Sequence, residues 1–265
     1  MWFSANPDKA WVEKFFLLYT PVWMALMAMM MLTGWVDTWS NGALLLHAAL
    51  VALPIFVIPL LVHRRFSDKP VRDSYFLKAN LYLFVFGFWG NYAGSEYFFD
   101  LLGMVYHFPN ATTTLDAALI GSGEQVVPLI MYGYTHAYFM TYHATATIAL
   151  RRLKPLWSSA SPVRQWCLFL LLVFVIGYCW AWAETKGMAN PLLASSFYYE
   201  KMALMLKYGS MIYATYFIAS FPIYYFIDED QQRPWSLLQV VAGALAASTL
   251  TFYMLDVAVH VVERL

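Results

Sequence analysis

Long apolar runs constrain this chain more than any other feature of its sequence. A helix needs about 20 predominantly apolar residues to cross the hydrocarbon core of a bilayer. Runs of about that length, bounded by charged residues, Pro or Gly, recur along the sequence. We predict about seven spans, of which the third and sixth contain polar residues inside the apolar run. The predicted spans are residues 15–35, 43–62, 76–97, 126–150, 165–183, 198–226 and 237–261.

The composition agrees with lipid as the main solvent. Of the 265 residues, 61% are hydrophobic and 12% are charged, a balance that a water-soluble domain of this size rarely has. The net charge is zero, so it gives no argument for binding to nucleic acid or to a strongly anionic partner. The sequence shows no internal repeat and no long hydrophilic stretch. It therefore predicts an all-α, polytopic transmembrane helical bundle in a single domain, residues 1–265, with membrane lipid as a partner and no nucleic acid.

Positive charges in the short connections predict the orientation of this bundle. Lys and Arg resist translocation and collect in cytoplasmic loops. They occur before the first span, between the second and third and between the fourth and fifth, whereas residues 36–42 and 98–125 contain none. We predict a cytoplasmic N-terminus, with residues 101–125 folded as a lid over the opposite end. The membrane would be the endoplasmic reticulum in a eukaryote and the inner membrane in a bacterium.

Ionisable side chains inside the predicted spans mark the candidate site. Such a group is costly in hydrocarbon, so it usually faces the interior of a bundle. We predict Glu96 and Glu184 near the non-cytoplasmic ends of their spans, with His136 and Lys207 somewhat deeper. His143 follows His136 by two helical turns on the same face. A carboxylate close to another acid/base group in an apolar wall provides the acid and base roles of a catalyst.

Structural roles stay open for several of these residues. Asp256 is near a helix end, where it could meet interfacial water or pair with His260 four residues later. His143 could bond a tyrosine, and Lys207 could be the counter-ion of a carboxylate. Each of these alternatives requires no catalysis.

No metal or cofactor is predicted. The sequence has no HExxH motif, no Cys pair and no dense group of His residues, and it lacks GxGxxG, Walker and GxSxG motifs. Cys167 and Cys179 lie in one apolar run, where inert thiols are common. Any chemistry would therefore rest on the side chains alone.

Several segments resemble the cycloeucalenol cycloisomerase family. The opening NPDKAWVEKFFLLYTPVW is similar to the family's N-terminal signature. The further similar segments are GNYAGSEYFFDLLGMVYHFP from Gly90, THAYFMTYHATATIALRRL from Thr135, ETKGMAN from Glu184, and YATYFIASFP with IDED from Tyr213. The resemblance therefore extends over nearly the whole chain.

The resemblance implies a sterol substrate and an acid/base reaction. The family converts a 9β,19-cyclopropyl sterol of the cycloeucalenol type into a Δ8 sterol of the obtusifoliol type without redox change. An acid must protonate the carbon that becomes the C19 methyl group, and a base must take the proton from C8. We assign Glu184 and His136 as the acid/base pair. Glu96, where plant members have His, would assist, and His143 is a further catalytic candidate.

The expected cavity must hold a flat polycyclic molecule and stabilise a carbocation. Aromatic rings suit both tasks, because their faces attract positive charge. Asn91 or Tyr92 would hydrogen-bond the sterol hydroxyl. The predicted substrate-binding residues are Asn91, Tyr92, Tyr132, Trp180, Trp182, Lys207 and Asp256.

Three other functions use the same residue types. A sterol Δ8–Δ7 isomerase of the emopamil-binding type also protonates and deprotonates its substrate through carboxylates, so only product analysis separates it. A non-catalytic sterol or lipid carrier would bind without forming product. A proton-coupled transporter also uses buried His and carboxylates, but this chain is short and lacks an inverted repeat.

Overall fold

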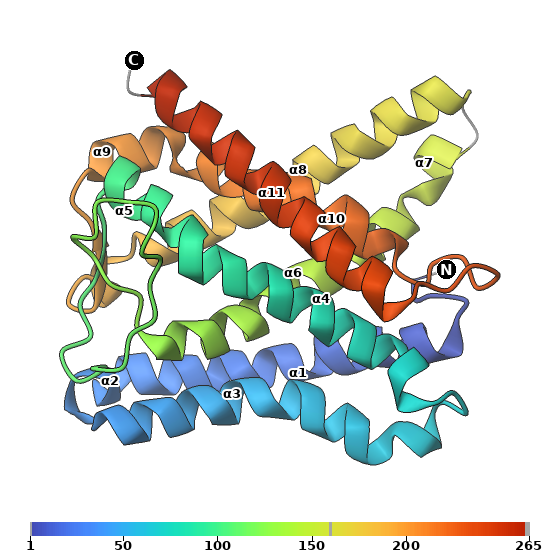
Figure 1. Cartoon of the computed structure of the whole chain (residues 1–265), viewed down its shortest axis with the longest axis horizontal. Coiled ribbons are helices and arrows are strands. Elements are labelled where there is room, and N and C mark those ends of the chain that lie inside the picture. The colour runs from blue at the N-terminus through green and yellow to red at the C-terminus, as the bar shows by residue number, and fades with distance from the viewer. Residues whose placement is uncertain (1, 159–160, 263–265) are drawn as a thin grey trace.

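The computed structural model describes residues 2–158 and 161–262, except for the side chain of Leu192. Within these ranges the fold is all-α, apart from one pair of three-residue strands. The helices run back and forth between two ends of the molecule (Figure 1). The basic end holds residues 2–6 and the connections 63–74, 153–158 and 227–236, and the strand end holds the connections 33–40, 103–128 and 189–201.

Local sequence signals explain the limits of the first helices. α1 (Pro7–Leu32) begins after Asn6, whose side chain accepts a hydrogen bond from the backbone N–H two residues later at 3.2 Å. Gly34 then adopts the left-handed backbone region, with φ of 69°, and so ends this helix. The short α2 (Trp35–Thr38) leads into α3 (Asn41–Val62), which runs back beside α1 (Figure 1).

The next helices are less regular. α4 (Tyr75–Trp89) continues through a π-helical turn (Gly90–Gly94) into α5 (Ser95–Leu102), so that one long helix crosses the molecule. A long connection then leads to α6 (Leu129–Arg152). The remaining helices are α7 (Lys154–Ser158), α8 (Pro162–Met188), α9 (Met202–Leu204), a second π-helical turn (Met205–Gly209), α10 (Ser210–Phe226) and α11 (Leu237–Val262). α10 packs against α6, α8 and α11.

Four of the described helices are long and apolar enough to cross a membrane, and they match the first, second, fifth and seventh predicted spans. The other three predicted spans are largely helical, but their passage through a membrane stays a prediction. The sixth begins later than predicted, because residues 197–199 pair as a strand instead of joining the helix. The four candidate spans are Pro7–Leu32, Asn41–Arg65, Pro162–Met188 and Leu237–Val262.

The two strands come from different connections and meet at the strand end. β1 (Met104–Tyr106) pairs antiparallel with β2 (Phe197–Tyr199), with Met104 opposite Tyr199. Because opposite residues in an antiparallel pair share one face, the first and third residues of both strands face the same way. The rest of the connection before α6 lies over this end of the bundle, where Ser122 donates its hydroxyl to Asp100 of α5 at 2.6 Å (Figure 1).

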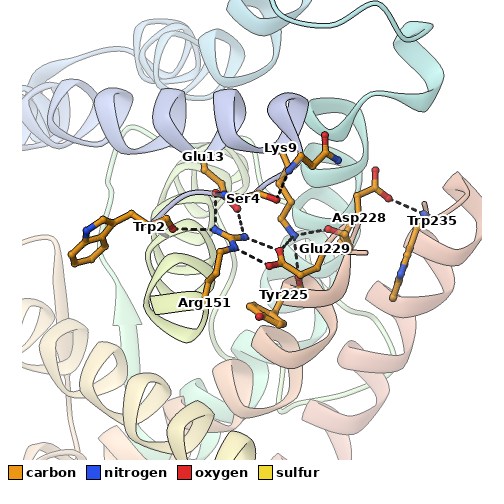
Figure 2. A network of polar contacts seen from close by, with 11 residues as sticks. Trp2, Ser4, Lys9, Glu13, Arg151, Tyr225, Asp228, Glu229 and Trp235 are labelled. Carbon is orange, nitrogen blue, oxygen red and sulfur yellow. Dashed lines mark hydrogen bonds and ion pairs between the residues drawn. The ribbon is translucent and has the colours of Figure 1, made fainter. Parts of the chain in front are cut away.

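A buried ion network joins three helices at the basic end (Figure 2). Arg151 in the last turn of α6 bonds the carboxylates of Glu13 in α1 and Glu229 after α10, at distances of 2.6 and 2.8 Å. Lys9 of α1 also binds Glu229 at 2.9 Å, and it donates to two backbone carbonyls near the end of α10. Two cations and two carboxylates thus balance, which offsets the cost of burying them.

The ion network makes the stability of the fold vary with pH in the acidic range. Burial by itself would raise the pKa of Glu229, but hydrogen bonds from Arg151 and the charge of Lys9 lower this pKa to about 2. A carboxyl with a depressed native pKa contributes stability that is present above its unfolded pKa, near 4.3, and is lost as pH falls through about 2. We expect a loss on the order of 3 kcal/mol between about pH 5 and pH 2.

Thermal unfolding in detergent from pH 6 to pH 2 tests this dependence on Glu229. The wild-type chain is expected to be more stable than Glu229→Gln at pH 6, and the difference should shrink as pH falls. A difference that stays constant over this range would contradict the depressed pKa.

Candidate active site

A pocket lies among the helices beside the strand pair. Its walls belong to the α4–α5 helix, α6, α8 and α10, and the inward face of the two strands closes it at the strand end. The cavity volume open to the centre of a water molecule is about 80 Å³. The lining residues are Gly90, Asn91, Ser95, Phe98, Met104, Tyr106, Met131, Thr135, Tyr138, Phe139, Glu184, Thr185, Met188, Phe197, Tyr199, Tyr213 and Tyr216.

Glu184 is the only side chain with a formal charge among the described residues that line this pocket. It lies in the last turns of α8, where the hydroxyl of Tyr213 donates a hydrogen bond to one carboxylate oxygen at 2.6 Å. Its other oxygen is buried and has no hydrogen-bond partner among the described residues. The hydroxyl of Tyr142 in α6 also lies near this carboxyl group. A carboxyl with one anchored oxygen and one oxygen that makes no regular hydrogen bond is suited to exchange a proton with a bound molecule.

Aromatic and methionine side chains form most of the remaining wall. Tyr213 and Tyr216 of α10 lie with their ring centroids 5.6 Å apart, and Phe98 of α5 packs against both rings. Methionines also contribute, and their flexible thioethers adapt to irregular shapes. Because the open volume is small, a tetracyclic ligand would have to displace such side chains to fit. The aromatic faces that surround it would stabilise positive charge.

The π-helical turn in the α4–α5 helix brings backbone and small side chains to the pocket. Its hydrogen bonds span one more residue than those of an α-helix, which changes the direction of the side chains that follow. Asn91 in this turn donates to the carbonyl of Gly87 at 2.9 Å and accepts from Thr135 of α6 at 3.2 Å. Gly94 lies so close to Tyr216 that an added Cβ would be 2.0 Å from the tyrosine hydroxyl oxygen.

The structure does not bring His136 into the pocket that contains Glu184. His136 lines a separate small pocket with Tyr132, and its Nε2 lies 2.8 Å from the side-chain oxygen of Asn80 in α4. Helix periodicity explains the separation, because Thr135 and Phe139 occupy the face of α6 that points toward Glu184. The pairing of His136 with Glu184 stays a prediction without support from this arrangement.

His143 is enclosed among aromatic rings, with both ring nitrogens satisfied. Nδ1 lies 2.7 Å from the carbonyl of Phe139, so Nδ1 carries the hydrogen and Nε2 accepts from the hydroxyl of Ser220 at 2.9 Å. Its side chain is fully buried and lines none of the pockets described in this section. This arrangement fits the structural alternative, although the bonding partner is a serine and not a tyrosine.

Glu96 lies on the opposite side of the α5 helix, under the connection that precedes α6. It lines a third pocket with Asp100 and Gly121, and one of its carboxylate oxygens is buried without a hydrogen-bond partner among the described residues. Gly121 has a φ of 82°, and an added Cβ there would overlap the Glu96 carboxylate. The long connection therefore covers Glu96, while Ser95 next to it faces the pocket of Glu184.

Of the predicted substrate-binding residues, only Asn91 lines the pocket of Glu184. Tyr92 stacks on Phe88, and Tyr132 donates to the carbonyl of Leu115 at 2.6 Å. Trp180 packs against Tyr142, with ring centroids 4.7 Å apart. The other three, Trp182, Lys207 and Asp256, are exposed on the outer surface. A carboxylate oxygen of Asp256 lies 4.0 Å from Nε2 of His260, which is the pairing expected if Asp256 has a structural role.

Tyrosines are the site residues that the sequence-based assignment left out. Tyr106, Tyr138, Tyr199, Tyr213 and Tyr216 all line the pocket. A signal for most of them was present, because the segments similar to the family contain every lining residue except Met131, Phe197 and Tyr199. These lining residues come from four of the similar segments, residues 90–109, 135–153, 184–190 and 213–222, which are distant in sequence and meet at one pocket.

Fold and site together define a class: a helical chain with several candidate membrane spans and an aromatic pocket that contains one carboxyl group among the described residues. Among the described residues, no group of three or more His, Cys, Asp or Glu could hold a metal ion. The chain is 34% identical over 262 residues to cycloeucalenol cycloisomerase of Arabidopsis thaliana. The aligned region covers 97% of this chain and 87% of that protein.

The chain therefore belongs to the cycloeucalenol cycloisomerase family, as its sequence segments predicted. No family model matches the chain, and no solved structure does so either.

Proposed function

We propose that this chain is a membrane isomerase that opens the 9β,19-cyclopropane ring of a cyclopropyl sterol to give a Δ8 sterol, as in the conversion of cycloeucalenol to obtusifoliol. Its relationship to a cycloeucalenol cycloisomerase over almost its whole length supports the substrate class. The position of Glu184 in an aromatic pocket is the observation that supports the chemistry.

In this proposal Glu184 moves the proton. The acid form of the carboxyl donates its proton to C19, and the electron pair of the C9–C19 bond forms the new C–H bond. Positive charge then develops at C9, where the rings of Tyr213 and Tyr216 stabilise it. The resulting carboxylate takes the proton from C8, so the C8–C9 double bond forms and the acid is restored.

A single group serves as acid and base here because the other candidates lie elsewhere. His136 bonds Asn80 in its own pocket, His143 is enclosed, and Glu96 lies under the long connection. Tyr213 has a positioning role, since its hydroxyl holds one carboxylate oxygen and leaves the other for the substrate.

A feeding experiment tests the function. The full chain is expressed in a sterol-making host without this activity, cycloeucalenol or cycloartenol is supplied, and the sterols are identified by mass spectrometry. We expect a Δ8 sterol without the cyclopropane ring. Unchanged cyclopropyl sterols together with conversion of Δ8 to Δ7 sterols would indicate the emopamil-binding type, whereas tight binding without product would indicate a carrier.

Substitution of Gly94 tests the close packing behind the pocket. In Gly94→Ala the new Cβ would overlap the Tyr216 hydroxyl, so the ring must move within the pocket. We expect turnover to fall roughly 100-fold, because displacement of a pocket wall by about 1 Å costs that much in positioned catalysis. Gly187→Ala in α8 is the matched control, since no atom lies within 4 Å of its added Cβ. Equal turnover in the two variants would contradict the role of this packing.

A further inference from the structure

A further polar pocket lies at the basic end of the molecule, away from Glu184. It is lined by Phe3, Ala5, Arg151, Arg152, Lys154, Pro155, Ser158 and Glu229. We propose that this pocket binds the phosphate group of an anionic phospholipid. The proposal is independent of the reaction at Glu184.

Two of the cations in this pocket have no counter-ion among the described residues. Arg151 and Glu229 belong to the balanced ion network, in which Arg151 bonds two carboxylates (Figure 2). Arg152 and Lys154 are exposed, and no described carboxylate lies within ion-pair distance of either side chain. The pocket therefore presents positive charge to a ligand, and phosphate is a strong acceptor for both side chains.

The N-terminal arm, residues 2–5, forms one wall of the pocket and is held in place by the buried network. Arg151 donates to the carbonyl of Trp2 at 3.2 Å, and Glu13 accepts from the backbone N–H of Ser4 at 3.0 Å (Figure 2). This places the Trp2 ring 5.2 Å from the guanidinium carbon of Arg152. The arm thus gives the pocket a fixed wall beside cations that would otherwise project into solvent.

Exposed apolar side chains follow the pocket along the chain and favour a lipid over free phosphate. Leu156 of α7 and Val163 and Trp166 of α8 are 63%, 76% and 56% exposed. Such side chains would lie against acyl chains, while Arg152 and Lys154 reach the headgroup. Because Lys and Arg collect at this end, it is also the end expected to face a leaflet rich in anionic lipid.

Lipid retention tests the proposal on the purified full chain. The chain is placed in nanodiscs of phosphatidylcholine with a minor fraction of phosphatidylglycerol, and bound lipids are counted by native mass spectrometry. We expect Arg152→Gln/Lys154→Gln to bind phosphatidylglycerol about tenfold more weakly than wild type. The matched control is Arg64→Gln/Arg65→Gln, which removes two exposed cations from the same end outside this pocket and should bind within twofold of wild type.

Each outcome decides the proposal. Equal loss in both double variants would mean a general surface attraction and would overturn a specific site, as would full retention by Arg152→Gln/Lys154→Gln. Inorganic phosphate that displaces the lipid at similar concentrations would assign the pocket to a soluble ligand and also overturn it. Should the double variant unfold, the single exposed change Lys154→Gln is expected to weaken binding roughly threefold.

Discussion

Replacement of Glu184 by Gln is expected to lower the turnover of a cyclopropyl sterol by roughly 1,000-fold, within the range that general acid–base catalysis contributes. Gln keeps the size of the side chain and can still accept the hydrogen bond from Tyr213, but its amide cannot deliver a proton. The measurement is the rate of Δ8 sterol formation by purified protein in detergent. Substrate binding should change much less, since the pocket wall is retained.

Two further variants separate this role from general effects of charge. Glu200→Gln changes an exposed carboxyl at the same end and should leave turnover within twofold of wild type. Glu96→Gln removes another buried carboxyl with an unpartnered oxygen at the same end, and we expect less than a tenfold loss because Glu96 lies outside the pocket. Turnover by Glu184→Gln within tenfold of wild type would show that another group carries the proton.

Replacement of Arg151 by Met is expected to destabilise the fold by about 3–5 kcal/mol, the usual cost of removing one partner from a buried ion pair. All N–H donors of Arg151 are used, in bonds to Glu13, to Glu229 and to the carbonyl of Trp2. Without the guanidinium, Glu13 loses its cation in a site where its side chain is only 2% exposed. The free energy of unfolding in detergent measures the loss.

The double variant Glu13→Gln/Arg151→Met shows whether the unpaired charge is the cause. It should recover part of the stability, because it no longer buries a lone carboxylate at Glu13. Arg64→Met, an exposed arginine at the same end, should change the free energy of unfolding by less than about 0.5 kcal/mol. Equal destabilisation by Arg64→Met and Arg151→Met would mean that the buried network contributes nothing of its own.

The placement of His136 illustrates what spacing along a helix can and cannot predict. The spacing of His136 and His143 indicates a shared helix face, and both indeed point into the protein. They bond different helices, however, since His136 lies against Asn80 of α4 and His143 against Ser220 of α10. Adjacent Thr135, not His136, faces the pocket of Glu184. Which neighbour each face meets depends on helix packing, which periodicity alone does not contain.

The sequence by itself determined the all-α class, the four helices that are long and apolar enough to cross a membrane, the family and Glu184 as a candidate. These follow from local properties: the length and hydropathy of a run, the charges at its ends, and short motifs. The Asn6 cap and Gly34 also limit the first helix through local chemistry.

Only the tertiary structure decided which residues share a pocket. β1 pairs with β2 across the ninety intervening residues 107–196, and this pairing removes the start of the sixth predicted helix and closes the pocket of Glu184. The tyrosines around Glu184 and the carboxylates around Arg151 likewise come from segments far apart in sequence. Such contacts depend on how helix faces meet in three dimensions, because each helix offers several faces and the packing of all of them together selects one arrangement.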